Sequence, residues 1–541
     1  MATDRLIRAI PPRDYLLFLG IVILGLMARW LTAVWLGLED SPFAVSLSAG
    51  TDHPELYRIA LRDHFWSYLL YNHTEPPLAV IRDALIERWF GPSQVIVAKL
   101  TSAAVFDSVA AGLACLLARQ LGAGRLIAIS AAVLISCRYI LMETATLGAG
   151  WDAMNPMLVA LFAFALLAFT SRPTIIRSLF VGLTAAVVIT SFNFGPLVVV
   201  PATLVAGLLI WLQTGVWRCS LPALVLPLFV IGLIVGKNVQ QHGLWSMSSG
   251  VGQNIMQAYA SGLKDPSGQE RGAYLMAQRR GYPDWWLWCY NEARNRGVHT
   301  NLNIPSWYGT CMYRRINGEL QPDYAGLSDY FRDHPDRHLQ QILERDLANA
   351  ANRPWLWAGP VSWRATEISI EYGKVSQFVM FDTLIERPLY FIRRAVRTLK
   401  NHWLENGAIS YTLLNRLSFE TPAILFAGSL LVIPFFYLGH WLIFVYGFGA
   451  LWRTARNIRS LSVDRIAGHI SAGNLLLAVA VLPALFASVL LACCENYRHA
   501  LVFLPLVMVL AAQAVNRPSF WGRIWPGTGR FAAGNLFPHK K

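Results

Sequence analysis

The chain has 541 residues, of which 55% are hydrophobic and 14% are charged, and its mean hydropathy is +0.40. Soluble domains carry about 25% charged residues, so this composition, with its repeated apolar runs of about 20 residues, excludes an ordinary soluble protein and predicts a helical protein with several membrane spans. The net charge is +14, but the lysines and arginines gather at the ends of the apolar runs, which favours membrane orientation over nucleic-acid binding.

The first apolar run, residues 15–37, is too long for the hydrophobic segment of a signal peptide and has no small-residue cleavage site, so it is expected to remain as a span. Later runs predict nine further spans. The eighth run contains Pro434 and could cross the membrane once or form two short helices. The ten predicted spans are residues 15–37, 94–118, 126–142, 151–170, 178–193, 195–213, 221–236, about 421–450, 469–492 and 500–515.

The basic residues predict the sidedness of the chain. If residues 421–450 cross once, seventeen lysines and arginines fall on the side of both termini, whereas the short loops on the opposite side hold only Arg498. Basic residues favour the cytoplasmic side, so both termini are predicted to be cytoplasmic in a multi-pass protein of the plasma or inner membrane. Two short helices at 421–450 would move the basic segment RTARNIR outside, which the same rule disfavours.

Two polar regions, residues 38–93 and 237–420, are then predicted to face outward. The first contains two amphipathic helices, from His53 to Leu70 and from Leu78 to Phe90, and the EPP sequence opens the second because proline suits a first helical turn. Both helices are expected to lie in the membrane interface. The aromatic residues expected at headgroup level are Trp66, Tyr68 and Trp89.

The longer region, residues 237–420, is predicted to be a folded, mixed but mostly helical domain, because long structureless loops are uncommon. Its segment DYFRDHPDRHLQQILERDLANAANRP has a helical pattern. Cys289 and Cys311 both lie in this region, and a disulfide between them is plausible outside the cytoplasm. The predicted organisation is a seven-span module (1–236) with juxtamembrane helices at 53–91, an outward domain (237–420), a three-span module (421–515) and a cytoplasmic tail (516–541).

Three motifs occur in a set order within this topology. They are TDHPELYRIA, with Asp52, Tyr57 and Ala60, TEPPL at 74–78, and ENYRHALVFLPLVMVL at 495–510. Together with seven N-terminal spans and a long outward loop after the seventh, they resemble the GT-C superfamily of membrane glycosyltransferases. The nearest branches are the protein O-mannosyltransferases and the lipid A aminoarabinose transferases, and the likeness in layout covers nearly the whole chain.

The sequence departs from these families at two positions. His53 follows Asp52, where family members often carry an Asp-Glu pair. Glu75 precedes the two prolines, where the aminoarabinose branch often has a lysine that helps to bind the donor phosphate. The phosphate contact must therefore come from another residue, and the donor or the acceptor can differ.

The resemblance implies an inverting glycosyltransferase that moves a sugar from a polyprenyl-phosphate donor to an acceptor hydroxyl at the outer face of the membrane. The acceptor could be a glycan, a lipid or a protein. Such a reaction needs a carboxylate that takes the proton of the attacking hydroxyl and positive groups that stabilise the leaving phosphate. Aromatic residues of the outward domain, as in DWWLWCY, could stack on sugar rings or form the core of that domain.

Asp52 is the expected base, since it matches the catalytic aspartate of the family by position; otherwise it would cap the following helix. Asp40 is the rival base. Asp152 opens the fourth span on the outward side and is either a helix cap or a second catalytic acid, in some branches a metal ligand. The mannosyltransferase-like branches need no metal, so none is required, although Mg²⁺ or Mn²⁺ is possible. Tyr57 and Glu75 are expected to support the first outward region.

Arg498 is the best candidate for the donor phosphate, because it belongs to the closing motif and stands alone in the short outward loops; interfacial snorkelling is its alternative role. Weaker candidates are Arg58, Lys237 and His242. Lys99 and Asp107 lie inside the second predicted span, where charges are costly, and could pair with each other or line the site.

Two other classes of function stay open. A transporter or flippase of lipid-linked glycans should show matching halves with broken helices and charges at the bilayer midplane, and the sequence has no such halves. A non-catalytic membrane scaffold would not require Asp52 and Arg498 to converge. All three readings have the lipid bilayer as a partner, and none involves nucleic acid.

Overall fold

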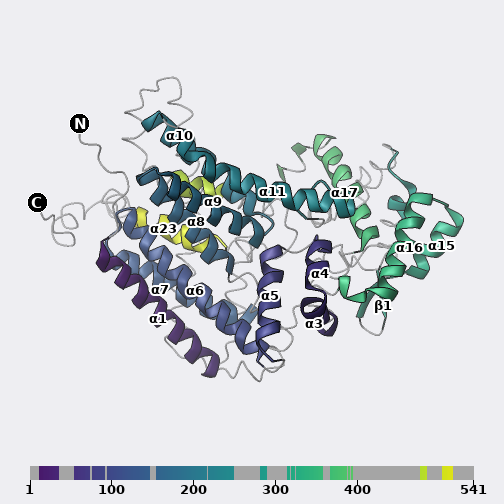
Figure 1. Cartoon of the computed structure of the whole chain (residues 1–541), viewed down its shortest axis with the longest axis horizontal. Helices are drawn as coiled ribbons and strands as arrows, with labels where there is room; N and C mark the ends of the chain where they lie inside the picture. The colour runs from purple at the N-terminus through teal and green to yellow at the C-terminus, as the bar shows by residue number, and fades with distance from the viewer. Residues whose placement is uncertain are drawn as a thin grey trace, which may run out of the picture.

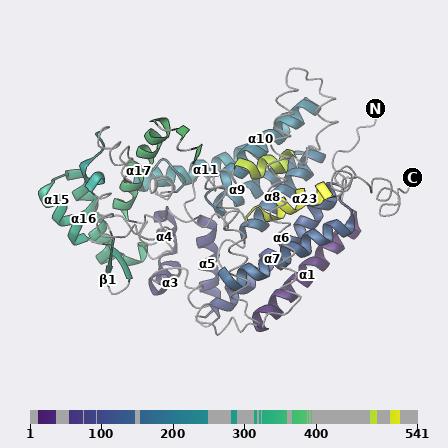
Figure 2. The ribbon, with the colours of Figure 1, turned by 180° about the vertical axis from the view of Figure 1, so that it is seen from behind.

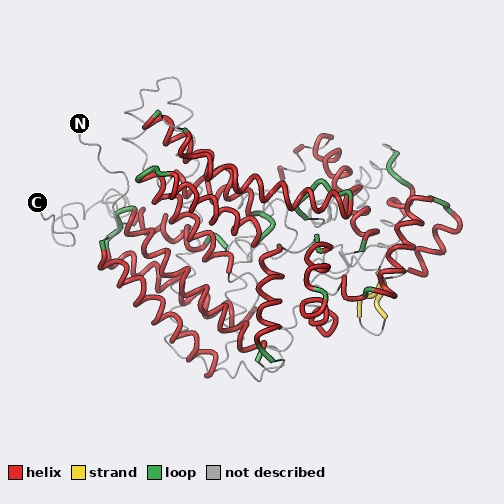
Figure 3. The backbone as a smooth tube through the Cα atoms, viewed as in Figure 1, coloured by secondary structure: helices red, strands yellow, loops and turns green. Residues whose placement is uncertain are grey.

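The computed structural model describes residues 11–35, 54–73, 76–91, 94–146, 154–215, 217–248, 281–288, 313–316, 319–322, 324–357, 366–386, 388–389, 392–393, 475–483 and 502–515. Within these residues the chain is almost entirely helical (Figure 3). The strands described form one antiparallel hairpin, β1 (Tyr313–Ile316) and β2 (Glu319–Pro322), in which Tyr313 lies opposite Pro322.

Apolar helices stand at the predicted spans that the structure describes. Four stretches are long and apolar enough to cross a membrane: Pro12–Leu31, Val97–Gln120, Met154–Ser171 and Arg218–His242. These helices indicate a lipid bilayer as the environment of the chain, whereas the full count of ten spans stays a prediction because residues 421–450 and most of 469–492 lie outside the described residues. The apolar helices are α1 (Pro12–Trp35), α6 (Val95–Gln120), α7 (Arg125–Thr146), α8 (Met154–Ser171), α9 (Ile175–Ser191), α10 (Gly195–Thr214), α11 (Leu221–His242) and α23 (Leu504–Val515).

The bundle is packed through small residues. Ala110, Ala111 and Ala114 of α6 are fully buried, and α6 touches α1, α7, α8 and α23. A Cβ on Gly112 would lie 2.7 Å from the Phe18 ring of α1, so only glycine permits this approach of the two helices. Close backbone contact through Gly and Ala is the main source of helix association in lipid, where the solvent is as apolar as the side chains.

Charged side chains in the bundle are paired. At the start of α1, Asp14 lies 3.1 Å from Arg119 and 3.4 Å from Arg125, so the N-terminal end of α1 stands beside the turn between α6 and α7, as the predicted topology requires. Farther along α1, Arg29 lies 3.9 Å from Asp107. Asp107, which the sequence allowed to pair with Lys99, therefore has an ionic partner on another helix.

The first outward region differs in detail from the prediction. The helix expected from His53 to Leu70 is two helices, α3 (Pro54–Asp63) and α4 (Phe65–Tyr71), separated at His64. The second helix, α5 (Pro77–Trp89), begins at a proline as expected. The break lets both short helices turn buried side chains toward α5. The core that they share consists of Tyr57, Ala60, Leu61, Phe65, Tyr68, Val80 and Ala84.

This packing corrects the predicted headgroup contacts. Tyr68 is 2% exposed and stands edge-on to Tyr57, so the expectation that it faces the headgroups is wrong. Its aromatic ring instead fills the space between α3 and α5. Trp66 and Trp89 are 71% and 76% exposed, which agrees with an interfacial position for these two residues.

Apart from the hairpin of β1 and β2, the described part of the outward domain is helical, and the segment that begins DYFRDHP forms parts of two helices, α15 (Tyr324–Asp333) and α16 (Arg337–Asn352). Its aromatic residues form a core: Trp286 is fully buried, stacks on Tyr372, and donates its indole N–H to Ser376 Oγ at 3.1 Å. They are thus packing residues within the described part of the domain. The elements are α15 (Tyr324–Asp333), α16 (Arg337–Asn352), the short 3-10 helix η4 (Pro354–Trp357) and α17 (Glu367–Glu386).

The helices α3, α4 and α5 lie between the bundle and the outward domain (Figure 1). The view from behind shows the same order, with α17 next to the end of α11 (Figure 2). A direct contact joins the first outward region to the domain, because the His64 ring stacks on Trp355 of η4 with centroids 4.2 Å apart. Segments far apart in the sequence therefore meet at one end of the bundle.

Candidate functional site

The site is built around the last residue of α11. His242 ends this helix, and Gly243 follows with φ +61°, a left-handed conformation that glycine adopts without strain. The imidazole is fully buried. The helix of the seventh predicted span (221–236) thus continues beyond its predicted end and finishes at a histidine that faces protein instead of solvent.

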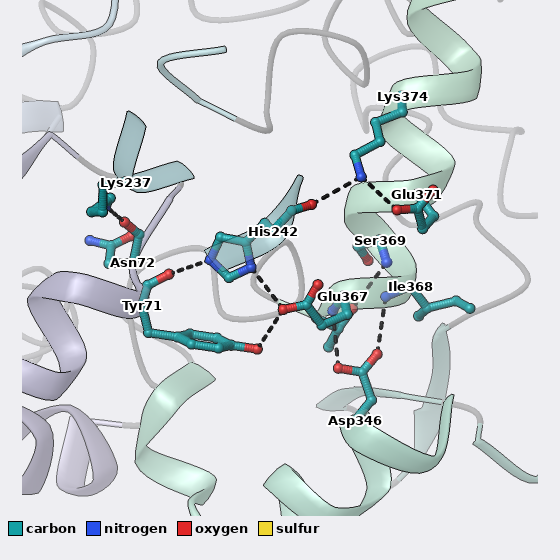
Figure 4. Close-up of polar contacts among 11 residues, drawn as sticks. Tyr71, Asn72, Lys237, His242, Asp346, Glu367, Ile368, Ser369, Glu371 and Lys374 are labelled. Carbon is teal, nitrogen blue, oxygen red and sulfur yellow. Dashed lines mark hydrogen bonds and ion pairs between the residues drawn. The ribbon is translucent and has the colours of Figure 1, made fainter. Parts of the chain in front are cut away.

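His242 joins two other segments through both ring nitrogens (Figure 4). Its Nε2 lies 2.9 Å from the backbone oxygen of Tyr71, at the end of α4, and its Nδ1 lies 2.7 Å from Glu367 Oε1, at the start of α17. The Tyr71 hydroxyl also donates to Glu367 Oε1, at 3.2 Å. We call Tyr71, Lys237, His242 and Glu367 the His242 cluster.

The hydrogen-bond pattern places a proton between His242 and Glu367. A backbone carbonyl oxygen only accepts, so Nε2 of His242 carries a hydrogen. Nδ1 then faces a carboxylate oxygen at 2.7 Å, and that contact is favourable only if one of the two atoms is protonated. The pair is therefore an imidazolium with a carboxylate, or a neutral imidazole with a carboxylic acid, and one proton lies between the two side chains.

Glu367 is held in place by a buried aspartate of α16. Asp346 is fully buried, and its two carboxylate oxygens accept the backbone N–H groups of Glu367 and Ile368, each at 3.0 Å. Burial raises the pKa of Asp346 to about 7, although these two hydrogen bonds act in the opposite direction. Asp346 thereby fixes the first turn of α17 and the position of Glu367 in it.

Two lysines complete the junction (Figure 4). Lys237 lies on α11 before His242, and its ammonium group donates to the backbone oxygen of Asn72. Lys374 of α17 donates to the backbone oxygen of His242 at 3.0 Å and to Glu371 at 2.6 Å. Two side chains of α11, Lys237 and His242, therefore bind the end of α4. The helix α17 is bound to α11 through Glu367, which contacts the His242 ring, and through Lys374, which contacts the His242 backbone oxygen.

The remaining described candidates lie on α3. Tyr57 is buried and donates its hydroxyl to Asp83 of α5 at 3.1 Å, which agrees with the support expected from it. Arg58 lies 3.1 Å from Glu55 and 3.6 Å from Glu87. Because two carboxylates already surround Arg58, its charge is less available for a phosphate than the sequence alone suggests.

The structure brings together two of the nine predicted site residues, Lys237 and His242, with the first outward region. Nothing in the sequence relates Glu367 or Asp346 to them, because the contact between Glu367 and His242 spans 125 positions. The only local signal was the Thr-Glu pair at 366–367, which is typical of a helix start. Asp40, Asp52, Glu75, Asp152 and Arg498 lie outside the described residues, as do Cys289 and Cys311.

No group of three or more His, Cys, Asp or Glu side chains suited to a metal ion occurs in the part of the chain that the structure describes. Asp152, the acidic residue considered as a ligand of Mg²⁺ or Mn²⁺, lies outside that part. The described site is therefore a cluster of one carboxylate, one imidazole, one ammonium group and one phenol. Comparisons of the chain with protein-family models, with curated proteins and with solved structures find no match.

Proposed function

We propose that the chain is an inverting glycosyltransferase that moves a sugar from a polyprenyl-phosphate donor to an acceptor hydroxyl at the outer face of the membrane. The observation that supports it most is the meeting of three segments at His242: the first outward region at Tyr71, the end of α11, and the outward domain at Glu367. A lipid-linked sugar needs such a place, because its tail lies in the bilayer while its reacting atoms need polar groups at the surface.

The residues of the proposed reaction keep the roles that the resemblance implies. Asp52 takes the proton of the acceptor hydroxyl as its oxygen attacks the sugar, with Asp40 and Asp152 as the alternatives. Arg498 stabilises the leaving phosphate, and Lys237 is the described cation closest in sequence to the His242 pair. Asp52 shortly precedes α3, whose first residue is Pro54, so a base there would stand at the start of the region that ends at Tyr71.

The proposal also sets the sidedness. The chain would cross the membrane ten times with both termini in the cytoplasm, and the His242 cluster would face the periplasm or the cell exterior. No metal is required by the proposed reaction. The acceptor could be a glycan, a lipid or a protein hydroxyl.

The test is transfer from radiolabelled polyprenyl-phosphate sugars to a membrane extract by the purified protein. Asp52→Asn removes the base and should lower transfer by about 10²- to 10⁴-fold, the usual contribution of a general base. Asp63→Asn is the matched control, because Asp63 is an exposed carboxylate of the same outward region. The control should retain transfer, and both variants should unfold at the temperature of the wild type.

Other outcomes separate the alternatives. Full activity of Asp52→Asn, with loss in Asp40→Asn or Asp152→Asn, would move the base to one of those residues. Absence of transfer from a panel of donor sugars, with movement of a lipid-linked glycan across vesicle membranes, would replace the enzyme with a flippase. Absence of both activities would leave a scaffold.

A further inference from the structure

The helix α17 carries apolar side chains on two sides. On one side it belongs to the core of the outward domain, because Tyr372 is buried against Trp286 and Val379 is also buried. On the other side, large apolar side chains recur every three or four positions, the spacing of a single helix face, and two of them follow the end of α17. We call these residues the α17 stripe: Phe378, Phe381, Ile385, Leu389 and Ile392.

The α17 stripe is exposed along its length. Its five side chains are between 49% and 74% exposed. Contiguous apolar surface of this kind is unfavourable in water and marks a contact with a protein or a membrane. A helix that is apolar on two sides is accommodated between two apolar environments, of which the domain core is one. The surroundings of the stripe indicate the second.

The stripe begins beside the end of a helix that faces lipid. The helix α11 belongs to one of the stretches long and apolar enough to cross a membrane, and it exposes large side chains such as Leu228 and Phe229. Its end lies next to α17, where Lys374 donates to the backbone oxygen of His242 at 3.0 Å (Figure 2). Phe378 stands one helical turn after Lys374. The apolar surface of α17 therefore starts one turn beyond the contact with the end of α11.

Two side chains near this contact are of the types found at a membrane surface. Trp245 follows α11 and is 84% exposed, and tryptophan is enriched at the level of the lipid headgroups. The ammonium group of Lys374 lies beside the turn that leads to Trp245, since a Cβ on Gly243 would stand 3.6 Å from its nitrogen. The start of the α17 stripe is therefore expected at the depth of the headgroups.

The charges near the far end of the stripe select the kind of partner. Residues 382–400 contain five basic residues and two acidic ones, Asp382 and Glu386. Arg393, which follows Ile392, is exposed. The other four basic residues are Arg387, Arg394, Arg397 and Lys400. An apolar helix face accompanied by arginine and lysine is typical of a helix that lies on a membrane with anionic lipids.

We propose that the α17 stripe inserts into the bilayer leaflet at the end of α11, and that Arg393 binds the phosphate groups of anionic lipids there. A protein partner would also cover apolar side chains, but it would not explain why the stripe begins where the lipid-facing surface of α11 ends. The proposal does not depend on the transfer reaction. It does affect the His242 cluster, because Glu367 is the first residue of the helix whose later turns would be held at the membrane surface.

The test identifies the molecules that touch the stripe. The photoreactive amino acid p-benzoylphenylalanine replaces Phe381 in the full-length protein, which is placed in nanodiscs of equal parts phosphatidylcholine and phosphatidylglycerol. Mass spectrometry after illumination then identifies the cross-linked partner. Lipid adducts should form with a yield near that at Phe229 of α11. The yield should be at least about tenfold above that at Leu347, an exposed residue of α16, because burial of one aromatic side chain favours the apolar environment by such a factor.

A second arm tests the charge. The same amino acid at Ile392 should form about fivefold more adduct with phosphatidylglycerol than with phosphatidylcholine, since each arginine near an anionic membrane surface adds about this factor to binding. Arg393→Gln should lower this preference. Arg332→Gln, at an exposed arginine of α15, is the matched control and should leave the preference unchanged. Phe378 is the second position for the photoreactive group if replacement of Phe381 disturbs folding.

Three results would overturn the proposal. Equal lipid yields at Phe381 and Leu347 would mean that the stripe does not enter the bilayer. Cross-links to residues 421–450 would make the partner a segment of the same chain, and cross-links to a second copy would make the stripe a dimer surface. Equal adducts with the two lipids at Ile392 would keep the insertion but reject lipid binding by Arg393. Sugar transfer is not measured in any arm, so loss of the transferase assignment would leave these results unchanged.

Discussion

The membrane bundle and the junction at the end of α11 are held together by different forces. In the bundle, α6 packs against its neighbours largely through apolar and small side chains, among them several alanines and Gly112, and charged pairs such as Asp107 with Arg29 add to this packing. At the junction, α4, α11 and α17 meet through His242, Glu367, Lys237 and Lys374, nearly all of them bound to a specific partner. Close packing of side chains holds the bundle together, whereas hydrogen bonds between specific partners hold the junction together.

This difference has a structural consequence. Small-residue packing leaves the helices little room to shift, whereas the junction collects side chains that donate and accept hydrogen bonds. The bundle therefore acts as a rigid base that sets the position of the end of α11. The junction uses that position to hold the first outward region against the outward domain.

The largest effect is expected from removing the centre of the junction. His242→Ala leaves the Glu367 carboxylate with the Tyr71 hydroxyl but without the imidazole, and breaking a buried pair in this way costs about 3 kcal/mol. Unfolding in mixed micelles of a mild detergent and SDS measures the loss. His338→Ala, an exposed histidine of α16, is the matched control and should change stability little.

The same measurement on Glu367→Ala and on the double variant completes a cycle. Because the two side chains share one proton at 2.7 Å, the losses should be far from additive, with the double variant little worse than either single one. Additive losses would mean that His242 and Glu367 stabilise the junction separately, and the shared proton would then have no role in it.

A smaller loss is expected from disturbing the bundle beneath the junction. Gly182 of α9 faces α11, and a Cβ there would lie 2.5 Å from the Pro222 backbone oxygen and 2.8 Å from Leu226. Gly182→Ala should therefore destabilise the chain by about 2 kcal/mol through overpacking. Gly232→Ala is the control, since no atom of the described residues lies within 4 Å of a Cβ at that position on α11.

Hydrogen exchange provides a second measurement on the same two variants. If the bundle sets the position of the end of α11, Gly182→Ala should also weaken the contacts of His242, and hydrogen exchange at the start of α17 should rise. Gly232→Ala should stabilise α11 slightly or leave it unchanged, because alanine favours helix more than glycine does. If hydrogen exchange at the start of α17 rises equally in Gly182→Ala and Gly232→Ala, the packing of the bundle does not determine the contacts at the junction.

The sequence predicted the bundle well because its signal is local. An apolar run of about 20 residues specifies a helix of a given length wherever it packs, and α1, α6 and α8 begin within a few residues of the predicted limits. The wrong predictions concern which side of a helix is buried and where a helix breaks. The break at His64 and the inward position of Tyr68 follow from packing against α5, which no pattern within residues 53–70 specifies.

The site was less predictable for the same reason. Lys237 and His242 could be found because they leave an apolar run on the predicted outward side. Glu367 and Asp346 could not, since their roles depend on contacts with segments far away in the chain. Asp52 and Arg498 rest on the resemblance alone and stay predictions, because they lie outside the described residues.

The next largest effect is expected to be a change of the free energy of unfolding with pH, which originates at Asp346. Its pKa in the folded chain is about 7, above the ordinary value of 3.8, so the folded state binds this proton more tightly than the unfolded state does. The contribution of Asp346 to stability is therefore full below about pH 4 and is lost as the pH rises toward 7. One proton limits the slope to about 1.4 kcal/mol per pH unit.

Asp346→Asn removes this titration, so the variant should approach or exceed the wild type in stability as the pH rises from 4 to 7. Unfolding at several pH values in that range measures the change. Asp336→Asn is the control: Asp336 caps α16 through the N–H of Leu339 from an exposed position, and asparagine caps a helix about as well as aspartate, so this variant should change stability little across the range. Parallel curves for the wild type and Asp346→Asn would mean that Asp346 keeps its ordinary pKa.

The smallest effect is expected where a polar contact lies on the surface. Arg332 is 2.5 Å from Asp329 on α15, a shorter distance than the one between His242 and Glu367, but the two side chains are 73% and 67% exposed. Water screens such a pair, so Arg332→Gln should change the free energy of unfolding by less than about 0.5 kcal/mol. Unfolding in mixed micelles at low and high salt measures the change. A loss comparable to that of His242→Ala would mean that burial is not the reason why the contact between His242 and Glu367 stabilises the chain more than a surface pair does.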